Sequence, residues 1–338
     1  MKLSLLQHYF RNPYNFDNVP SGYNLKRYYG VASNYRLRVQ KVSFSILTQN
    51  MALMVAPGKY CGANSREDVI AEIVYQIKTI SPDVVGLCEV FDNDERANIW
   101  NALKPTYPYA QAGPDGWAPF SDGGLLVISK HPFLQTHQHV YDADSGVDAM
   151  AYKGIIYVSI QPPGFVNPID LFYTHAQNLD VDNADGYEDR KEALFNQLRE
   201  MAQVVHEQNV FTSPAFIFGD INVPGDNSAL LNEMLNTLNN PVDLWLLAGN
   251  NHRDGCTNVR DNNFYSSMLM EDMLPDGVDD RIPQVDHRLD FILMKANPAF
   301  VPILEQIKVM KFMKNGRNLS DHFGLYASFN ELLHVQTF

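Results

Sequence analysis

The chain has 338 residues, of which 45% are hydrophobic and 12% aromatic, enough for a large folded core. Its formal net charge of −13 disfavours a polyanionic partner, because nucleic-acid-binding proteins usually present a basic face. The three cysteines argue against a disulfide framework and show no spacing typical of metal ligands.

Residues 1–40 show no clear period and are interrupted by proline and glycine, which predicts an irregular extension laid over a core. The sequence turns polar at Gln7, too early for the apolar segment of a signal peptide, and no run approaches the roughly 18 apolar residues of a membrane span. We therefore expect a soluble protein, cytoplasmic by default or exported by a route without a Sec-type signal peptide. No repeat or low-complexity linker divides residues 41–338, so these are expected to form a single domain.

Alternating apolar and polar residues over 42–49 predict the first strand. A capping pattern at Ser65 and an apolar stripe through residues 69–80 predict the helix that follows. A second strand is expected over residues 83–88. A helix between two strands is typical of an α/β layer architecture.

Further apolar segments predict the remaining strands, at residues 124–129, 154–160, 170–174, 215–218, 289–294 and 323–329. A second amphipathic helix is expected over residues 189–207, whereas residues 225–284 are read as a variable region. Many strands and few helices indicate two sheets packed together with helices outside.

Polar residues recur in or at the ends of these strands. The clearest case is Gly219-Asp220-Ile221-Asn222, where the strand period of two predicts that Asp220 and Asn222 point the same way. The other members of the set are Asn50, Glu89, His175, Asp290 and His322. Each alone could be a turn or surface residue, although a carboxylate inside the apolar strand at Asp290 needs a partner. Together they indicate a shared site.

The chemistry open to such a set is limited. Carboxylate and carboxamide oxygens without a thiolate favour a hard cation, Mg²⁺ before Zn²⁺. Two histidines offer a base and a second group for proton transfer or charge stabilisation. Since no Gly-x-Ser-x-Gly, Walker or dinucleotide-binding motif competes, the residues predict metal-assisted hydrolysis of a phosphate ester.

Four segments together resemble the endonuclease/exonuclease/phosphatase superfamily: Cys-Glu-Val-Phe-Asp-Asn at 88–93, Tyr-Thr-His-Ala-Gln at 173–177, Gly-Asp-Ile-Asn at 219–222 and Ser-Asp-His at 320–322. Within it, the segments 122–132 and 148–154 are similar to the neutral, magnesium-dependent sphingomyelinases. The resemblance covers about residues 42–329. It implies the deoxyribonuclease-I-like fold, a four-layered α/β sandwich in which two mixed sheets pack face to face with helices outside.

The resemblance also implies a metal centre and a base. Glu89, Asn50 and Asp321 would hold the catalytic Mg²⁺, with Mn²⁺ or Co²⁺ as substitutes. His322, oriented by Asp290, would take a proton from the attacking water. The reaction implied is in-line hydrolysis of sphingomyelin to ceramide and phosphocholine, in which positioned charge carries the rate.

Further roles follow from the same resemblance. Asp220 and Asn222 would position the water and the phosphoryl oxygens, and His175 would stabilise charge on the phosphorus. Lys153 and Phe91 would contact the substrate.

A secondary metal site is less complete. Asn93 and Asp122 match residues that bind a second metal in bacterial members of the family. Ser121, however, stands where the bacterial pattern has an acid.

Contact with a membrane is expected to be peripheral, and the chain is expected to be a monomer. Secreted bacterial members carry an aromatic, membrane-inserting hairpin before Ser-Asp-His. Here residues 311–317 are shorter and more basic, with Phe312 and Met313 as the apolar candidates for its tip. Residues 264–274 are an alternative docking surface or a plain surface helix.

Three rival functions share parts of this pattern. A metal-dependent nuclease on the same fold would keep the core residues, but the net charge and the lack of a clustered Lys/Arg stripe count against it. An inositol-phosphate phosphatase would carry a basic, aromatic signature after Gly-Asp-x-Asn, where this chain has Val223-Pro224-Gly225. A non-catalytic scaffold with a relict site would have no reason to keep all six strand-end positions.

Overall fold

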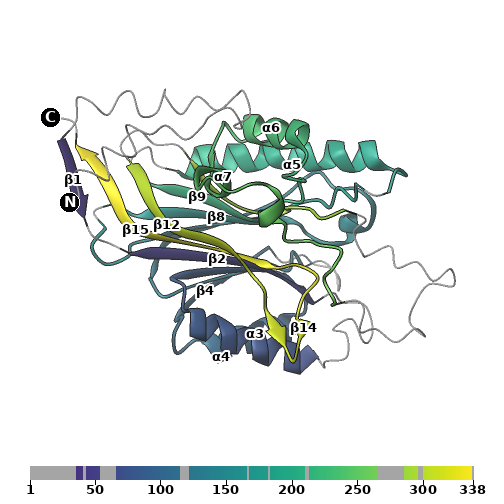
Figure 1. The fold of residues 1–338 in the computed structure, drawn as a ribbon, viewed down its shortest axis with the longest axis horizontal. Coiled ribbons are helices and arrows are strands. Elements are labelled where there is room, and N and C mark those ends of the chain that lie inside the picture. The colour runs from purple at the N-terminus through teal and green to yellow at the C-terminus, as the bar shows by residue number, and fades with distance from the viewer. Residues whose placement is uncertain are drawn as a thin grey trace.

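A computed structural model of the chain shows two β-sheets packed face to face, with helices on both outer sides (Figure 1). The residues that the structure describes are 36–40, 43–53, 66–114, 122–165, 167–181, 183–209, 213–264, 285–295 and 300–336. Among them, no helix has the length and apolar character needed to cross a membrane.

The first sheet is mixed. Its strands, in order across the sheet, are β1 (Arg36–Gln40), β15 (Gly324–Gln336), β2 (Phe44–Leu53), β3 (Val84–Val90), β5 (Leu126–Ser129) and β4 (Tyr109–Ala112), and β12 (Phe300–Met310) also pairs with β15. Strands β2 and β3 run parallel, and the other pairs are antiparallel.

The second sheet is also mixed. Its strands, in order, are β10 (Val242–Asp243), β11 (Asp290–Lys295), β9 (Ala215–Asp220), β8 (Ile169–His175), β7 (Gly154–Ile160) and β6 (Phe133–Val140). Strands β8 and β9 run parallel, and the other pairs are antiparallel. A separate hairpin consists of β13 (Met313–Lys314) and β14 (Arg317–Asn318).

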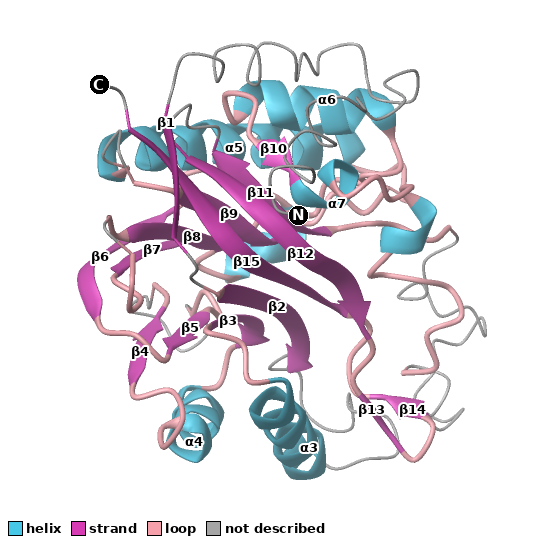
Figure 2. Cartoon of the chain, turned by 60° about the vertical axis from the view of Figure 1, so that its left-hand side comes forward, coloured by secondary structure: helices cyan, strands magenta, loops and turns pink. Residues whose placement is uncertain are grey.

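Helices cover the outer face of each sheet (Figure 2). Helices α3 (Arg66–Ile80) and α4 (Asn93–Leu103) pack on the first sheet through an apolar cluster. Helices α5 (Tyr187–Gln208) and α6 (Ser228–Thr237) pack on the second sheet in the same way. In the part of the chain that the structure describes, the remaining helical segments are short: α7 (Leu244–Leu247) and the 3₁₀ turns η3 (Gly146–Met150) and η4 (Arg253–Gly255).

The main core lies between the two sheets. Phe44 of β2 and Phe329 of β15 stack with ring centroids 6.4 Å apart, and Phe216 of β9 contacts Phe329 from the opposite sheet at 5.2 Å. Gly86 in β3 lets the ring of Tyr173 approach, since a Cβ at this position would lie 2.2 Å from that ring. Close packing of this kind holds the two sheets, and therefore their edges, in one relative position.

The structure confirms the predicted sandwich and contains each predicted strand and both predicted helices. It also contains elements that the sequence did not predict: β1, β4, β6, β10, β12, β13, β14, α4, α6 and α7. Residues 36–40, expected to be irregular, form β1 because they pair with the far end of β15. Strand β6 was missed because most of its side chains are exposed and it lacks a buried apolar face. Helix α6 lies within the region read as variable.

Candidate active site

The register of the second sheet places three of the predicted residues in one row. His175 ends β8, Asp220 ends β9 and Asp290 begins β11, and Asp220 pairs with both of the others. Two residues back along β9, Phe218 faces the core between the sheets. Because side chains alternate along a strand, the row of three lies just beyond this core and on the same side.

Gly219 allows β8 and β9 to approach each other at this point. Its φ is 135°, and a Cβ there would lie 2.0 Å from the backbone oxygen of Thr174. A residue with a side chain therefore cannot be accommodated without separating the strands. The glycine of the Gly-Asp pair is thus a requirement of the sheet, and the aspartate that follows is held against β8.

The first sheet contributes Asn50 from β2 and Glu89 from β3. Asn50 Nδ2 donates to Glu89 Oε1 at 2.8 Å and to Asp220 Oδ2 at 3.1 Å, so one carboxamide joins the two sheets. Regular alternation would turn Glu89 to the outer face, as it does Leu87. The φ of Glu89 is instead 56°, a left-handed conformation uncommon for residues other than glycine, and its carboxylate reaches Asn50.

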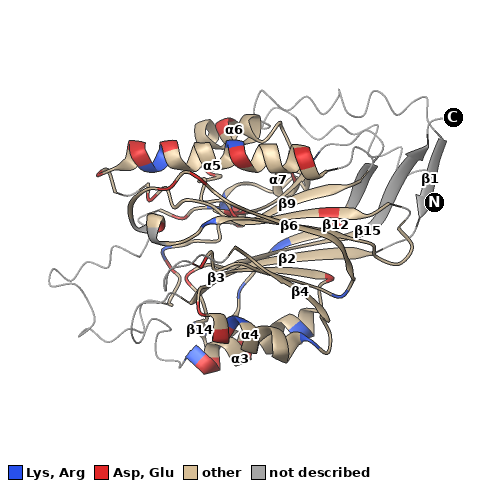
Figure 3. Cartoon of the chain, turned by 180° about the vertical axis from the view of Figure 1, so that it is seen from behind, with Lys and Arg blue, Asp and Glu red and all other residues tan. Residues whose placement is uncertain are grey.

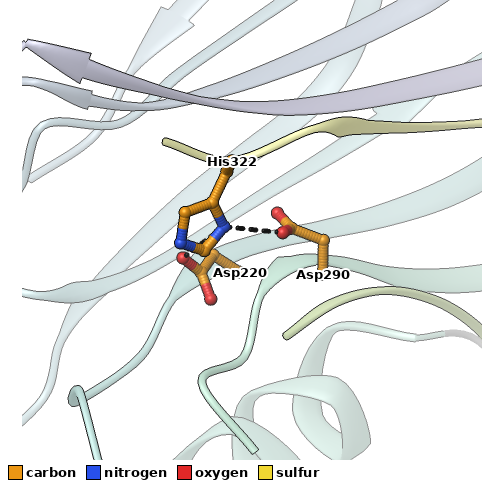
Figure 4. Close-up of side chains that lie close together, drawn as sticks. All are labelled: Asp220, Asp290 and His322. Carbon is orange, nitrogen blue, oxygen red and sulfur yellow. Dashed lines mark hydrogen bonds and ion pairs between the residues drawn. The ribbon is translucent and has the colours of Figure 1, made fainter. Parts of the chain in front are cut away.

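His322 and Asp290 form a hydrogen-bonded pair beside Asp220 (Figure 4). His322 Nδ1 lies 2.9 Å from Asp290 Oδ2 and 3.6 Å from Asp220 Oδ2. Burial alone would lower the pKa of this imidazole, but the charges of Asp220, Asp290 and Asp321 raise it well above its usual 6.5. Hydrogen bonding at Nδ1 leaves Nε2 as the nitrogen that can exchange a proton.

Two hydroxyl groups that the sequence did not single out support this pair. Ser320 Oγ donates to the backbone oxygen of Asn50 at 2.7 Å and accepts from the backbone N–H of His322 at 3.1 Å. Thr257 Oγ1 accepts from the backbone N–H of Asp290 at 3.3 Å. Ser320 could have been identified from its place in Ser-Asp-His. Thr257 lies in the region read as variable, where no sequence signal indicates it.

His175 is held by Lys153, a buried lysine just before β7. Lys153 Nζ lies 3.1 Å from His175 Nε2, donates to the backbone oxygen of Ala176 at 2.7 Å, and pairs with Asp148 at 3.1 Å. Burial and the charges of Lys153 and His322 lower the pKa of His175 well below 6.5, so its ring is neutral. An ammonium group can only donate, so His175 Nε2 is the acceptor and Nδ1 carries the hydrogen.

Asn222 lies near the row but is not part of the strand. Strand β9 ends at Asp220, and Asn222 has a left-handed φ of 58°. Its backbone N–H donates to Asp220 Oδ1 at 3.1 Å, and its Nδ2 donates to the backbone oxygen of Ala176 at 2.9 Å. The prediction that strand alternation aligns Asn222 with Asp220 was therefore wrong, because the chain turns before the next strand position.

The accumulated negative charge at this edge fits a divalent cation. Burial and the charge of Asp321 raise the pKa of Glu89 to about 7, and burial raises that of Asp220 to about 6. Asp290 Oδ1 is buried without a hydrogen-bond partner among the described residues. Asp220, Asp290 and His322 offer ligand atoms that all lie within 4.8 Å of one another. Oxygen-rich sites of this kind suit Mg²⁺.

Comparison with known proteins identifies the family. Residues 47–322 match the Endonuclease/Exonuclease/phosphatase family. The chain belongs to this family. It is 29% identical over 204 residues to phospholipase C of Staphylococcus aureus, covering 56% of this chain and 59% of that protein. It is 28% identical over 177 residues to sphingomyelinase C of Listeria ivanovii, covering 48% of this chain and 50% of that protein. The chain therefore spans less than two thirds of the length of these relatives.

A solved structure of the family has the same fold. A double mutant of beta toxin from Staphylococcus aureus, crystallised with bound magnesium ions, superposes with a TM-score of 0.60 at 20% identity. The match covers 85% of this chain and 99% of that chain. At this identity the likeness establishes the fold, and the chemistry has to be argued from the residues of this chain.

The residues that resemble a secondary metal site of the family contact an arginine in this chain. Arg96 donates to both carboxylate oxygens of Asp122 and to Asn93 Oδ1. Phe91 lies next to this group, in van der Waals contact range of Gly124. The structure thus brings Phe91, Asn93 and Asp122 together at the start of α4, separate from the row in the second sheet.

The hairpin before Ser-Asp-His differs from its prediction. Phe312 is 3% exposed and packs in the apolar cluster between the first sheet and helices α3 and α4. Its assignment as an apolar tip residue was therefore wrong. Met313 is 38% exposed. In the alternative docking segment, Phe264 is buried and residues 265–274 lie outside the described residues.

Proposed function

We propose that this chain is a phosphodiesterase that hydrolyses sphingomyelin to ceramide and phosphocholine. The observation that carries the proposal is the convergence of Asn50, Glu89, Asp220 and the His322–Asp290 pair across two sheets. These residues are far apart in sequence. Hydrogen bonds join Asn50 to Glu89 and Asp220 and join His322 to Asp290, and the two groups meet where His322 Nδ1 lies 3.6 Å from Asp220 Oδ2. The names of two family relatives, phospholipase C and sphingomyelinase C, support a phospholipid substrate.

Glu89, Asn50 and Asp321 would hold a divalent cation, Mg²⁺ with Mn²⁺ or Co²⁺ as substitutes; the charge of Asp321 already acts on Glu89. When bound, the cation would act as a Lewis acid toward the phosphoryl and leaving oxygens. Asn50 would keep Glu89 and Asp220 at a fixed separation, since its Nδ2 binds both. Its own Oδ1 already accepts from the backbone N–H of Ala52 at 3.0 Å, which orients the carboxamide.

His322 would be the general base once a bound cation offsets the carboxylate charges, among them that of Asp321, that raise its pKa in the metal-free protein. Its Nδ1–H is oriented by Asp290, so Nε2 would accept the proton of the attacking water. Asp220 would stabilise the imidazolium that forms, because its carboxylate is 3.6 Å from the ring. Attack of the water oxygen on phosphorus would break the bond to the ceramide oxygen, which would leave as an alkoxide and take a proton from solvent water. His322 would return its proton to solvent, and ceramide and phosphocholine would be released.

Lys153 would supply the positive charge that the phosphoryl oxygens require. His175 is neutral and its Nε2 accepts from Lys153, so its imidazole would act by orienting the ammonium group rather than by its own charge. Asn222 is bound to the same backbone oxygen as Lys153, that of Ala176. The two side chains would therefore be positioned together on one side of the phosphate.

A head-group release assay tests the proposal. Purified protein should release phosphocholine from sphingomyelin vesicles in Mg²⁺, and chelator should stop the release. Equal rates with and without chelator would exclude the metal role of Glu89. The same preparations should leave supercoiled DNA intact, since Lys and Arg positions alternate with Asp and Glu positions along the described ribbon (Figure 3). Nicking of DNA without release of phosphocholine would make the chain a nuclease.

We also expect a monomer that contacts the membrane peripherally. Sedimentation with vesicles, in the presence and absence of salt, measures this contact.

A further inference from the structure

Arg96 occupies the place between Asn93 and Asp122 where a second cation would bind. It is 4% exposed, and its Nη1 lies 2.6 Å from Asp122 Oδ1. Its Nη2 donates to Asp122 Oδ2 and to Asn93 Oδ1. Asn93 and Arg96 lie one turn apart on α4, so the helix presents the carboxamide and the guanidinium together.

The side-chain oxygens of Asn93 and Asp122 already accept hydrogen bonds. Asp122 Oδ1 accepts from Arg96 and also from the backbone N–H of Gly124 at 2.7 Å. The charges of Asp122 and Arg96 cancel, and a divalent ion would meet a buried guanidinium within contact distance. A cation could bind only if the Arg96 side chain moved out of the site. That movement would break its bidentate, charge-assisted hydrogen bonds to Asp122. The residues therefore do not fit a second cation.

The pair is connected to Glu89 through the backbone. Asp122 Oδ1 accepts a hydrogen bond from the backbone N–H of Gly124. The backbone oxygen of Gly124 in turn accepts from the N–H of Val90 at 3.0 Å. A Cβ on Gly124 would lie 2.9 Å from the ring of Phe91, so the turn and the ring are in close contact. Val90 directly follows Glu89, whose left-handed φ sets the direction of its carboxylate.

We infer that Arg96 is a resident cation that closes the secondary site to metal and positions Glu89 through Asp122 and Gly124. The inference rests on the divalent centre of the proposed function, and it concerns a different group of residues. Arg96 is a positioning residue, since its guanidinium binds Asp122 and Asn93, and Asp122 in turn reaches Glu89 only through the backbone of Gly124 and Val90.

Counting bound Mn²⁺ tests the closure of the site. Saturating Mn²⁺ is added to the wild type and to Asp122→Asn, and free ion is measured by electron paramagnetic resonance. We expect the same number of bound ions in both proteins. One ion fewer in Asp122→Asn would overturn the inference. A wild type that binds no ion would instead contradict the magnesium centre, and with it the positioning role.

The affinity for Mn²⁺ tests the positioning role. Arg96→Met should weaken binding about 10-fold or more, as is usual when a group that orients a metal ligand is lost. Arg66→Met is the matched control, because Arg66, at the start of α3, pairs with Glu95 of α4, the helix that carries Arg96, and its side chain is 26% exposed. A merely structural role would lower the melting temperature of both variants without changing either affinity, and that result would overturn the inference. If Arg96→Met does not fold, Arg96→Lys is measured against the same two outcomes.

Discussion

Replacing Glu89 with glutamine should stabilise the metal-free protein at alkaline pH. The folded protein raises the pKa of Glu89 from 4.5 to about 7, through burial and the nearby charge of Asp321. A gap of this size corresponds to about 3 kcal/mol by which folding disfavours the ionised carboxylate. The variant keeps the acceptor for Asn50 Nδ2 and removes the charge, so we expect a gain of up to about 3 kcal/mol in the free energy of unfolding.

The gain should depend on pH in a defined direction. Below the unfolded pKa of 4.5, Glu89 is protonated in both states and its charge costs nothing. Between 4.5 and about 7 the unfolded chain loses the proton first, so the wild type loses stability as the pH rises. Above about 7 the full cost is present, and the advantage of Glu89→Gln reaches its plateau.

Urea denaturation in chelator, at several pH values between 4 and 9, measures this difference. Glu192→Gln is the control, because Glu192 is exposed on α5 and should give little change. Added Mg²⁺ at about 1,000 times its Kd should reverse the order, since it would stabilise the wild type by about 4.1 kcal/mol and leave Glu89→Gln unchanged. A variant less stable than the wild type in chelator at pH 8, or a difference that does not vary with pH, would refute the reasoning.

Three further predictions address the base, the sheet and the lysine. His322→Ala should lower turnover about 10²- to 10⁴-fold, and a loss of only two- or three-fold would remove it from the mechanism. Gly219→Ala should lower the free energy of unfolding by about 3 kcal/mol or more. Gly316→Ala, whose Cβ would meet nothing within 4 Å, should lower it by about 1 kcal/mol. Equal losses would contradict the close approach of β8 and β9 at Gly219. Lys153→Met should lower turnover about 10²-fold or more without unfolding the protein. Lys78→Met, at an exposed position, should leave turnover unchanged. An equal loss of turnover in both variants would argue against a specific role for the charge of Lys153.

Hydrophobic pattern was sufficient to predict most of the sandwich. Strands such as β7 and β9 are buried on both faces, so short apolar runs bounded by polar residues marked them correctly. Strand β6, which is largely exposed, and α6, a short helix in the region read as variable, carried weaker signals. The sequence also located the polar residues at strand ends, and the fold brings several of them into hydrogen-bonded contact.

The direction of individual side chains depended on the tertiary structure. Alternation would have turned Glu89 away from Asn50, but the left-handed φ of Glu89 breaks the alternation within β3. Alternation does not apply to Asn222, because β9 ends at Asp220. Phe312 looked like an exposed tip residue and is buried against a cluster formed by distant elements.

The sequence by itself determined which residue types stand at which strand ends, because periodicity along one element depends only on neighbouring residues. Tertiary structure alone decided which polar and charged side chains meet. The carboxamide of Asn50 joins Glu89 to Asp220, and Arg96 binds Asp122. The physical reason is that pairing between charges depends on sheet register and packing. Those are set by contacts between residues far apart in the chain, and no local pattern records them.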